Sequence, residues 1–170
     1  MWRAAQSFGE LCELTERFLR GEITVFPGWN APELDVESDE IVPVLCAACR
    51  AGFLTCASQP ARPDQRAFVA GFAHETAAQQ LARMAGLDVR LFSPEFEGPS
   101  RAEPVSRHAG RFHAFAGHDA RFEELACFEG EIGAAAFDAL RSAVYVSAFD
   151  PEWGRTDRLW SELTRVLEPH

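Results

Sequence analysis

Polar side chains gather in two short segments that each follow an apolar run. Thr55, Ser58 and Gln59 end the stretch GFLTCASQP, while Asp150 and Arg155 follow the stretch VYVSAF. Two hydroxyl groups and an amide can hydrogen-bond a small polar ligand or a phosphate. In the second segment, the aspartate could act as a general base and the arginine could hold an anion. These residue types predict a binding or catalytic site that both segments build together.

The same residues also have structural interpretations, and both alternatives stay open. The serine–glutamine–proline sequence could simply begin a turn. Asp150 could hydrogen-bond its own loop backbone, and Arg155 could pair with a carboxylate. For the functional alternative, the candidate general base is Asp150, and the candidate ligand contacts are Thr55, Ser58, Gln59, Arg66 and Arg155.

Histidine and cysteine spacings do not predict a metal site. His108, His113 and His118 are five residues apart, so neighbours on a strand would face opposite sides, and no cysteine lies at a matching interval. Cys46 and Cys49 form a C-x-x-C pair late in an expected helix, where no helix amino terminus lowers a thiol pKa. The chain also lacks a Gly-x-Gly-x-x-Gly run. We therefore expect neither a metal nor a cofactor.

Composition excludes further chemistries and limits the kinds of partner molecule that the chain is expected to bind. All 16 basic residues are arginine, which rules out a lysine Schiff base and the phosphate loop that ends in Gly-Lys-Ser/Thr. The formal net charge of -10 repels a phosphate backbone, so no nucleic-acid partner is expected. A small polar molecule or a basic protein is compatible with this charge. The composition indicates no oligomeric state.

The cysteine count and the apolar runs indicate a cytoplasmic protein. Five cysteines, an odd number without a pattern, are typical of reduced thiols. The opening MWRAAQSFGELCEL is amphipathic rather than a secretory segment. The apolar runs are too short to span a membrane, so no membrane association is expected.

Periodicity, capping residues and glycines place the elements that must position these side chains. Ser7 and Glu10 fit a capping box, Ser38 can cap a second helix with Pro43 in its first turn, and Gly52 ends that helix. We predict helices over about 8–20, 38–51, 75–85, 132–143 and 156–167, and strands over about 53–58, 65–73, 87–91 and 144–149. Residues 21–37 and 93–104 are expected to be loops, 105–115 to be extended, and 122–128 to be either strand or helix.

The alternation of helices and strands favours one α/β or α+β domain over residues 1–170. We expect a single-layer, mixed and partly parallel sheet flanked by helices. Ligands of such folds bind beyond the carboxyl ends of the strands. The loops 55–64 and 150–157 should then meet at one edge of the sheet and leave a hollow between them.

Three segments resemble an actinobacterial family of domains of unknown function that is common in streptomycete-type genomes. They are WRAA at residues 2–5, SQP at 58–60 and FDPEWGRTDRLW at 149–160, and the resemblance covers nearly the whole chain. It implies a soluble, cytoplasmic, single-domain protein and no mechanism. Cysteines at positions 46, 49 and 56 depart from the family pattern.

Two functions follow from the sequence. The first is a small-molecule enzyme or ligand-binding protein with its site at the strand ends. The alternative is a non-catalytic acidic protein of the immunity or regulatory type that binds a basic protein partner. Its acidic surface would then be formed by Glu123, Glu124, Glu129 and Glu131.

Overall fold

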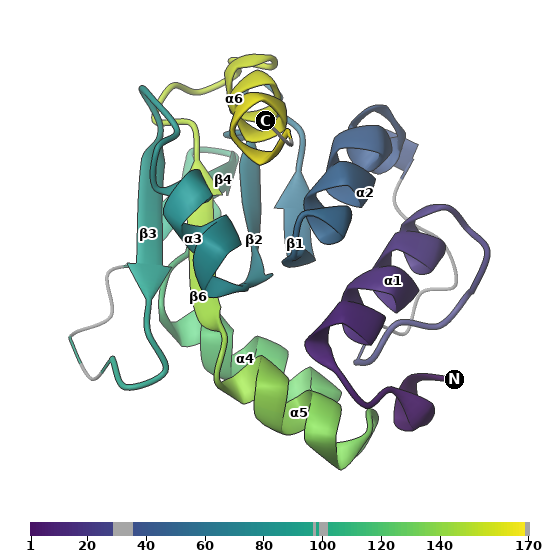
Figure 1. Cartoon of the computed structure of the whole chain (residues 1–170). Helices are drawn as coiled ribbons and strands as arrows, with labels where there is room; N and C mark the ends of the chain where they lie inside the picture. Colours follow the sequence, from purple (N-terminus) through teal and green to yellow (C-terminus); the bar gives the residue numbers. More distant parts are fainter. Residues whose placement is uncertain (29–35, 97, 99–101, 169–170) are drawn as a thin grey trace.

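A sheet with helices packed against it forms the centre of the molecule (Figure 1). The computed structural model describes residues 1–28, 36–96, 98 and 102–168. The helices are α1 (Phe8–Leu19), α2 (Val42–Arg50), α3 (Glu75–Leu81), α4 (Asp119–Phe128), α5 (Ala134–Arg141) and α6 (Arg158–Leu167). The strands are β1 (Phe53–Gln59), β2 (Phe68–Ala73), β3 (Asp88–Phe92), β4 (Glu103–His108), β5 (Arg111–Ala116) and β6 (Val144–Phe149). Short 3-10 turns cover Trp2–Ala4 and Val36–Ile41.

Most predicted elements are present, with shifts at their ends. The Ser7 hydroxyl accepts a hydrogen bond from the Glu10 backbone N–H at 3.2 Å, as the capping box predicts. The Glu10 carboxylate accepts from the backbone N–H of Gln6, one residue earlier than expected. Pro43 lies in the first turn of α2, also as predicted. Ser38 does not cap α2, because the 3-10 turn intervenes and Ile41 takes the N-cap position.

The structure decides the one ambiguous stretch and divides the predicted extended stretch in two. Residues 122–128 belong to helix α4. The extended stretch 105–115 divides into β4 and β5 at Ala109 and Gly110, which both have positive φ, of 49° and 76°. Two such residues in succession are typical of a tight hairpin turn. Of the predicted loop 21–37, residues 29–35 lie outside the described residues.

The prediction of a partly parallel sheet is wrong. The four-stranded sheet has the order β1-β2-β6-β3, and every neighbouring pair in it is antiparallel. Strands β2 and β3 run in the same direction, since each is antiparallel to β6, and α3 lies between them in the chain. β6 comes from the last third of the chain and inserts between them. The fold is therefore mixed α+β, with a separate β4–β5 hairpin.

This strand order still brings the two predicted loops to one end of the sheet. Gln59 pairs with Phe68, and Phe68 pairs with Phe149. The last residues of β1 and β6 therefore lie at the same end of the sheet, on either side of β2. The Gly154 N–H donates to the Gln65 carbonyl at 3.2 Å. Each loop therefore packs on the backbone of the other.

A β-bulge in β1 decides which of its side chains share a face. The pairing with β2 shifts between Thr55 and Ala57, so Thr55 lies opposite Gly71 and Ser58 opposite Val69. In a regular strand, side chains three residues apart face opposite sides. The extra residue places Thr55 and Ser58 on the same face.

The helices cover the sheet unevenly. Figure 1 shows α2, α3 and α6 over one face, while the β4–β5 hairpin lies on the far side. The largest buried side chains include Phe53, Phe72, Tyr145 and Phe149, all of them on the strands. Within the described ranges, no helix is both long and apolar enough to cross a membrane.

Gly71 should tolerate no side chain. A methyl group on it would overlap the Leu54 carbonyl oxygen and would force β1 away from β2. We expect Gly71→Ala to lower the free energy of unfolding in urea by about 2–3 kcal/mol. Gly9→Ala, in an open helical position, is the control and should be neutral or stabilising by up to about 1 kcal/mol. Equal effects of the two variants would contradict the close approach at Gly71.

Candidate functional site

Asp150 and Arg155 form an ion pair in which only the aspartate is fully buried. The Asp150 side chain is 0% exposed, and the Arg155 guanidinium donates to its carboxylate from Nε and Nη2, each at 2.7 Å. The backbone N–H of Glu152 donates to the same carboxylate at 2.8 Å. These contacts correspond to the structural alternative for both residues, in which Asp150 bonds its own loop backbone and Arg155 pairs with a carboxylate; the structure identifies that carboxylate as Asp150. The carboxylate is enclosed by its own turn.

Gln59 and Arg66 contact the β4–β5 hairpin. The Gln59 amide donates to the carbonyls of Arg66 and Val105, both at 2.9 Å. Arg66 donates to the Pro104 carbonyl at 3.1 Å, and its guanidinium lies 4.7 Å from the centre of the Trp153 ring. Both side chains therefore join the hairpin to the sheet.

Thr55 and Ser58 line a cavity of about 330 Å³ at the free edge of β1, which we call the β1-edge cavity. Its walls come from α1, the segment 26–28, Ser38, residues 55–58 of β1, and α4. The structure therefore separates the predicted site residues into three groups. Ser58 faces this cavity, whereas Asp150 does not line it. A smaller cavity of about 160 Å³ lies between residues 60–62 and Trp160.

One wall of the β1-edge cavity is held by aromatic packing. The Phe26 ring lies 5.3 Å from the Trp2 ring, 5.2 Å from Phe18 and 5.5 Å from Phe128, measured between centroids. The Trp2 indole N–H donates to the Val25 carbonyl at 2.7 Å. These contacts fix residues 25 and 26 against α1 and α4, so this side of the cavity is preorganised.

Gly28 closes the same wall against α4. Its φ is 72°, a conformation that favours glycine, and a side chain there would overlap Cys127. The chain can therefore pass directly over the α4 face that carries Cys127 and Glu124.

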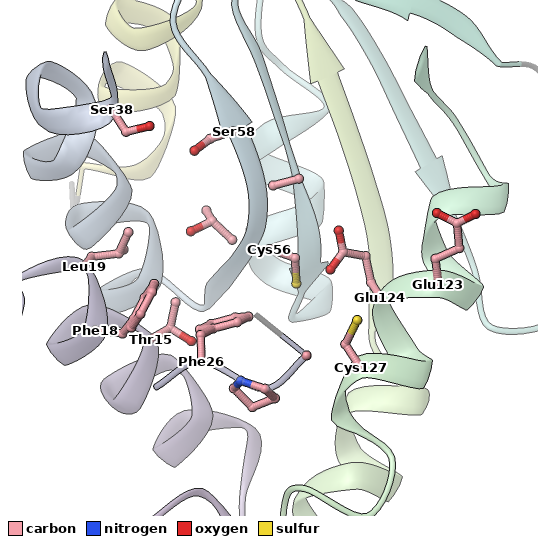
Figure 2. Close-up of a pocket in the computed structure, with 14 residues that line it drawn as sticks. Thr15, Phe18, Leu19, Phe26, Ser38, Cys56, Ser58, Glu123, Glu124 and Cys127 are labelled. Atoms are coloured by element: carbon pink, nitrogen blue, oxygen red, sulfur yellow. The ribbon is translucent and has the colours of Figure 1, made fainter. Parts of the chain in front are cut away.

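Glu124 supplies the carboxylate of the cavity. Figure 2 shows its side chain reaching toward Cys56 on β1, whereas Glu123 points away. Burial raises the Glu124 pKa from 4.5 to about 7, and the nearby negative charge of Glu123 adds to this, while a hydrogen bond with Cys56 acts in the opposite direction. A carboxyl group with such a pKa can gain or lose a proton near neutral pH.

The two cysteines of the cavity are not activated as nucleophiles. Burial, followed by the nearby Glu124 carboxylate, raises the pKa of the Cys56 thiol well above its ordinary value. Burial also raises the Cys127 thiol pKa, and Glu124 and Glu123 contribute to this rise. Since a thiolate is the reactive species, both thiols stay protonated at neutral pH.

Two hydroxyl groups lie buried on one face of the central strand β6. Tyr145 and Ser147 are both 0% exposed, and neither hydroxyl has a hydrogen-bond partner among the described residues. Burial and the charge of Glu124 raise the pKa of Tyr145, which places the tyrosine near the carboxylate. In the described part of the chain, no three His, Cys, Asp or Glu side chains gather so that they could hold a metal ion.

The acidic residues around Glu124 predicted a solvent-exposed surface, whereas Glu124 lines the cavity. Helical spacing offers a signal for its actual position, because Glu124 lies four residues before Phe128, which is fully buried. Residues at that spacing share one face of a helix. This spacing applies only in a helix, and the sequence alone predicts either a strand or a helix for residues 122–128.

These features define an α+β domain with a carboxylate-containing cavity at the free edge of its sheet. Over residues 1–170, the chain matches the family described as Domain of unknown function (DUF6919), and it belongs to that family. A comparison with curated proteins finds no match. The resemblance to a family of unknown function is thus confirmed, while the actinobacterial origin and the three motifs stay predictions.

Replacing Asp150 tests whether its role is structural. Asp150→Asn removes a buried charge that Arg155 and a backbone N–H both bind, so we expect a loss of about 2–3 kcal/mol in the free energy of unfolding. Asp157→Asn, at an exposed position in the same loop, should change it by less than about 0.5 kcal/mol. Urea denaturation measures both. An Asp150→Asn variant of unchanged stability would contradict this role.

Replacing Glu124 should stabilise the fold, in a way that depends on pH. Since the pKa is raised in the folded state, the folded chain keeps a proton that the unfolded chain releases between pH 4.5 and about 7. Stability should therefore fall as the pH rises through this window. Glu124→Gln removes that loss, so the variant should match the wild type at pH 4 and exceed it by about 2–3 kcal/mol at pH 8.

The control for this pH dependence is Glu129→Gln, at the exposed carboxyl end of the same helix. Its difference from the wild type should stay nearly constant between pH 4 and pH 8 when unfolding is followed by circular dichroism. A Glu124→Gln variant whose difference is equally constant would argue against a buried carboxyl group.

Proposed function

We propose that this chain binds a small molecule in the β1-edge cavity. The observation that carries the proposal is the Glu124 carboxyl group, held with a pKa of about 7 in the wall of a cavity of about 330 Å³. Small-molecule sites are commonly cavities of this size that combine mostly apolar walls with a few polar groups. Burying a carboxyl group costs stability unless a partner compensates it. A bound ligand that forms a hydrogen bond with Glu124 would offset that loss of stability.

The lining indicates the chemistry of the ligand. Phe18, Leu19 and Phe26 offer apolar surface, while Glu124 and Ser58 offer hydrogen-bonding groups. The best fit is a small molecule with an apolar body and a polar end that donates a hydrogen bond. A protonated amine suits the site particularly well, because its charge favours the ionised form of the carboxyl group.

If the chain is an enzyme, proton transfer is the chemistry that fits this cavity. Glu124 can accept or donate a proton near neutral pH, whereas the thiols of Cys56 and Cys127 are protonated there. Asp150 was the base expected from the sequence. To act as one, it would have to exchange its contacts with Arg155, so we assign the proposed proton chemistry to Glu124.

The alternative proposal, an acidic surface that binds a basic protein, has weaker support. Glu123, Glu129 and Glu131 are exposed, but Glu131 is paired with Arg3 at 3.4 Å and Glu124 faces the cavity. The four carboxylates therefore do not act as one surface. Binding of a basic protein would depend mainly on Glu123 and Glu129, the exposed carboxylates outside that ion pair.

Matched small ligands test the proposed function. We expect phenethylamine to bind at neutral pH more tightly than its neutral analogue 2-phenylethanol, with Kd values from ligand-observed NMR. Glu124→Gln should weaken amine binding about tenfold, which corresponds to about 1.4 kcal/mol. Glu129→Gln should leave it unchanged, since Glu129 is exposed and does not line the cavity. Equal losses in the two variants would mean that the amine is attracted only by the negative surface.

A further inference from the structure

The β4–β5 hairpin is a basic region in an acidic chain. The chain has 26 acidic residues among 170, yet none lies between Pro104 and His118, a stretch that contains two arginines and three histidines. At the base of the hairpin, the carboxylate of Glu103 lies 3.1 Å from Arg90. The local charge of the hairpin is therefore opposite to that of the whole chain.

One edge of this hairpin is paired and the other is free. On the β4 side, the backbone N–H of Arg66 donates to the Val105 carbonyl at 2.8 Å, and the N–H of Arg107 donates to the Asp64 carbonyl at 2.9 Å. Among the residues that the structure describes, β5 pairs with β4 alone. Its outer edge thus presents backbone N–H and C=O groups without strand partners.

The side chains of β5 are unusually exposed for their types. Phe112 is 57% exposed and Phe115 is 52% exposed, and Arg111 and His113 beside them are also exposed. Large apolar side chains that gather on a surface commonly mark an interaction site. The pairing of β5 with β4 shifts at His113, so Phe112 and Phe115 lie toward the same face, where their ring centroids are 6.5 Å apart.

Trp153 packs against the β4–β5 hairpin. The Trp153 ring lies 6.4 Å from the Phe112 ring, nearly parallel to it, and the guanidinium groups of Arg66 and Arg107 lie 4.7 and 4.6 Å from its centre. These contacts attach the hairpin to the loop that follows β6. A rigid edge loses little conformational entropy when a partner binds, which favours association.

We propose that the outer edge of β5 binds an acidic peptide segment in an extended conformation. The peptide backbone would continue the β4–β5 ladder, as in other cases of strand addition. Its carboxylates would meet Arg111 and His113, and its apolar residues would pack on Phe112 and Phe115. This surface shares no residue with the β1-edge cavity, so the proposal is independent of the ligand proposed there.

Charge and backbone chemistry favour a peptide over a nucleic acid. A long polyanion would be repelled by the net charge of -10 beyond the hairpin, whereas a short peptide touches only the basic region. A nucleic acid also has no backbone N–H groups with which to pair the free edge of β5.

Labelled peptides of defined sequence test the proposal. The probe is a fluorescein-labelled decapeptide of alternating glutamate and valine, and binding to the full chain is followed by fluorescence anisotropy. Arg111→Glu should weaken binding about tenfold or more, because it sets like charges opposite each other. Arg83→Glu, which reverses an exposed charge on another part of the chain, is the matched control and should leave binding unchanged.

Two further peptides separate strand pairing from simple charge attraction. A lysine–valine decapeptide should not bind, and a glutamate–valine peptide methylated on alternate backbone nitrogens should bind about tenfold more weakly, because methylated amides cannot pair. Binding of the methylated peptide with unchanged affinity would overturn the proposal.

Other partners give distinct results. Tighter binding of oligo(dT) or of vesicles that contain phosphatidylserine than of the acidic peptide would overturn the proposal. So would a dimer, measured by sedimentation, that Arg111→Glu dissociates, because β5 would then be an interface between two copies of this chain. Amide chemical-shift changes confined to residues 111–116 on addition of the acidic peptide would support it.

Discussion

The insertion of β6 between β2 and β3 is the constraint on which the rest of the structure depends. This strand pairs with both neighbours along nearly its whole length, and it contributes Tyr145 and Phe149 to the core. Because β6 separates two strands that run in the same direction, its pairs with both of them are antiparallel. β1 stays at the edge of the sheet, and the β1-edge cavity forms beside it.

Two features of the β1-edge cavity lower the stability of the fold. The backbone of an edge strand lacks partners on one side, and Glu124 places a carboxyl group where burial raises its pKa. The aromatic packing around Phe26 and the glycine at position 28 hold the walls in place around it. A proton held near neutral pH in a preorganised cavity is a feature of binding and catalytic sites more often than of a structural core.

The polar groups in and beside the two predicted loops have a structural role. Asp150, Arg155, Gln59 and Arg66 form contacts that tie the loops and the β4–β5 hairpin to the end of the sheet. Arg111 and His113 lie on the strand of that hairpin that is away from its paired edge. An acidic chain thus carries a carboxylate inside one cavity and a basic, aromatic strand at another surface, and the two do not overlap.

The amino-acid sequence by itself determined the local elements. Capping residues, apolar periodicity and glycines mark α1, α2, β1, β6 and α6, because these signals act within a few residues. As one of two alternatives, it also offered structural roles for Asp150, with its own loop backbone, and for Arg155, with a carboxylate that the sequence does not identify. Only the tertiary structure decided the order of the strands, the bulge that turns Thr55 and Ser58 to one face, and the inward position of Glu124. Those features depend on contacts between residues far apart in the chain, such as Leu54 with Gly71, and local patterns carry no information about which distant segments will meet.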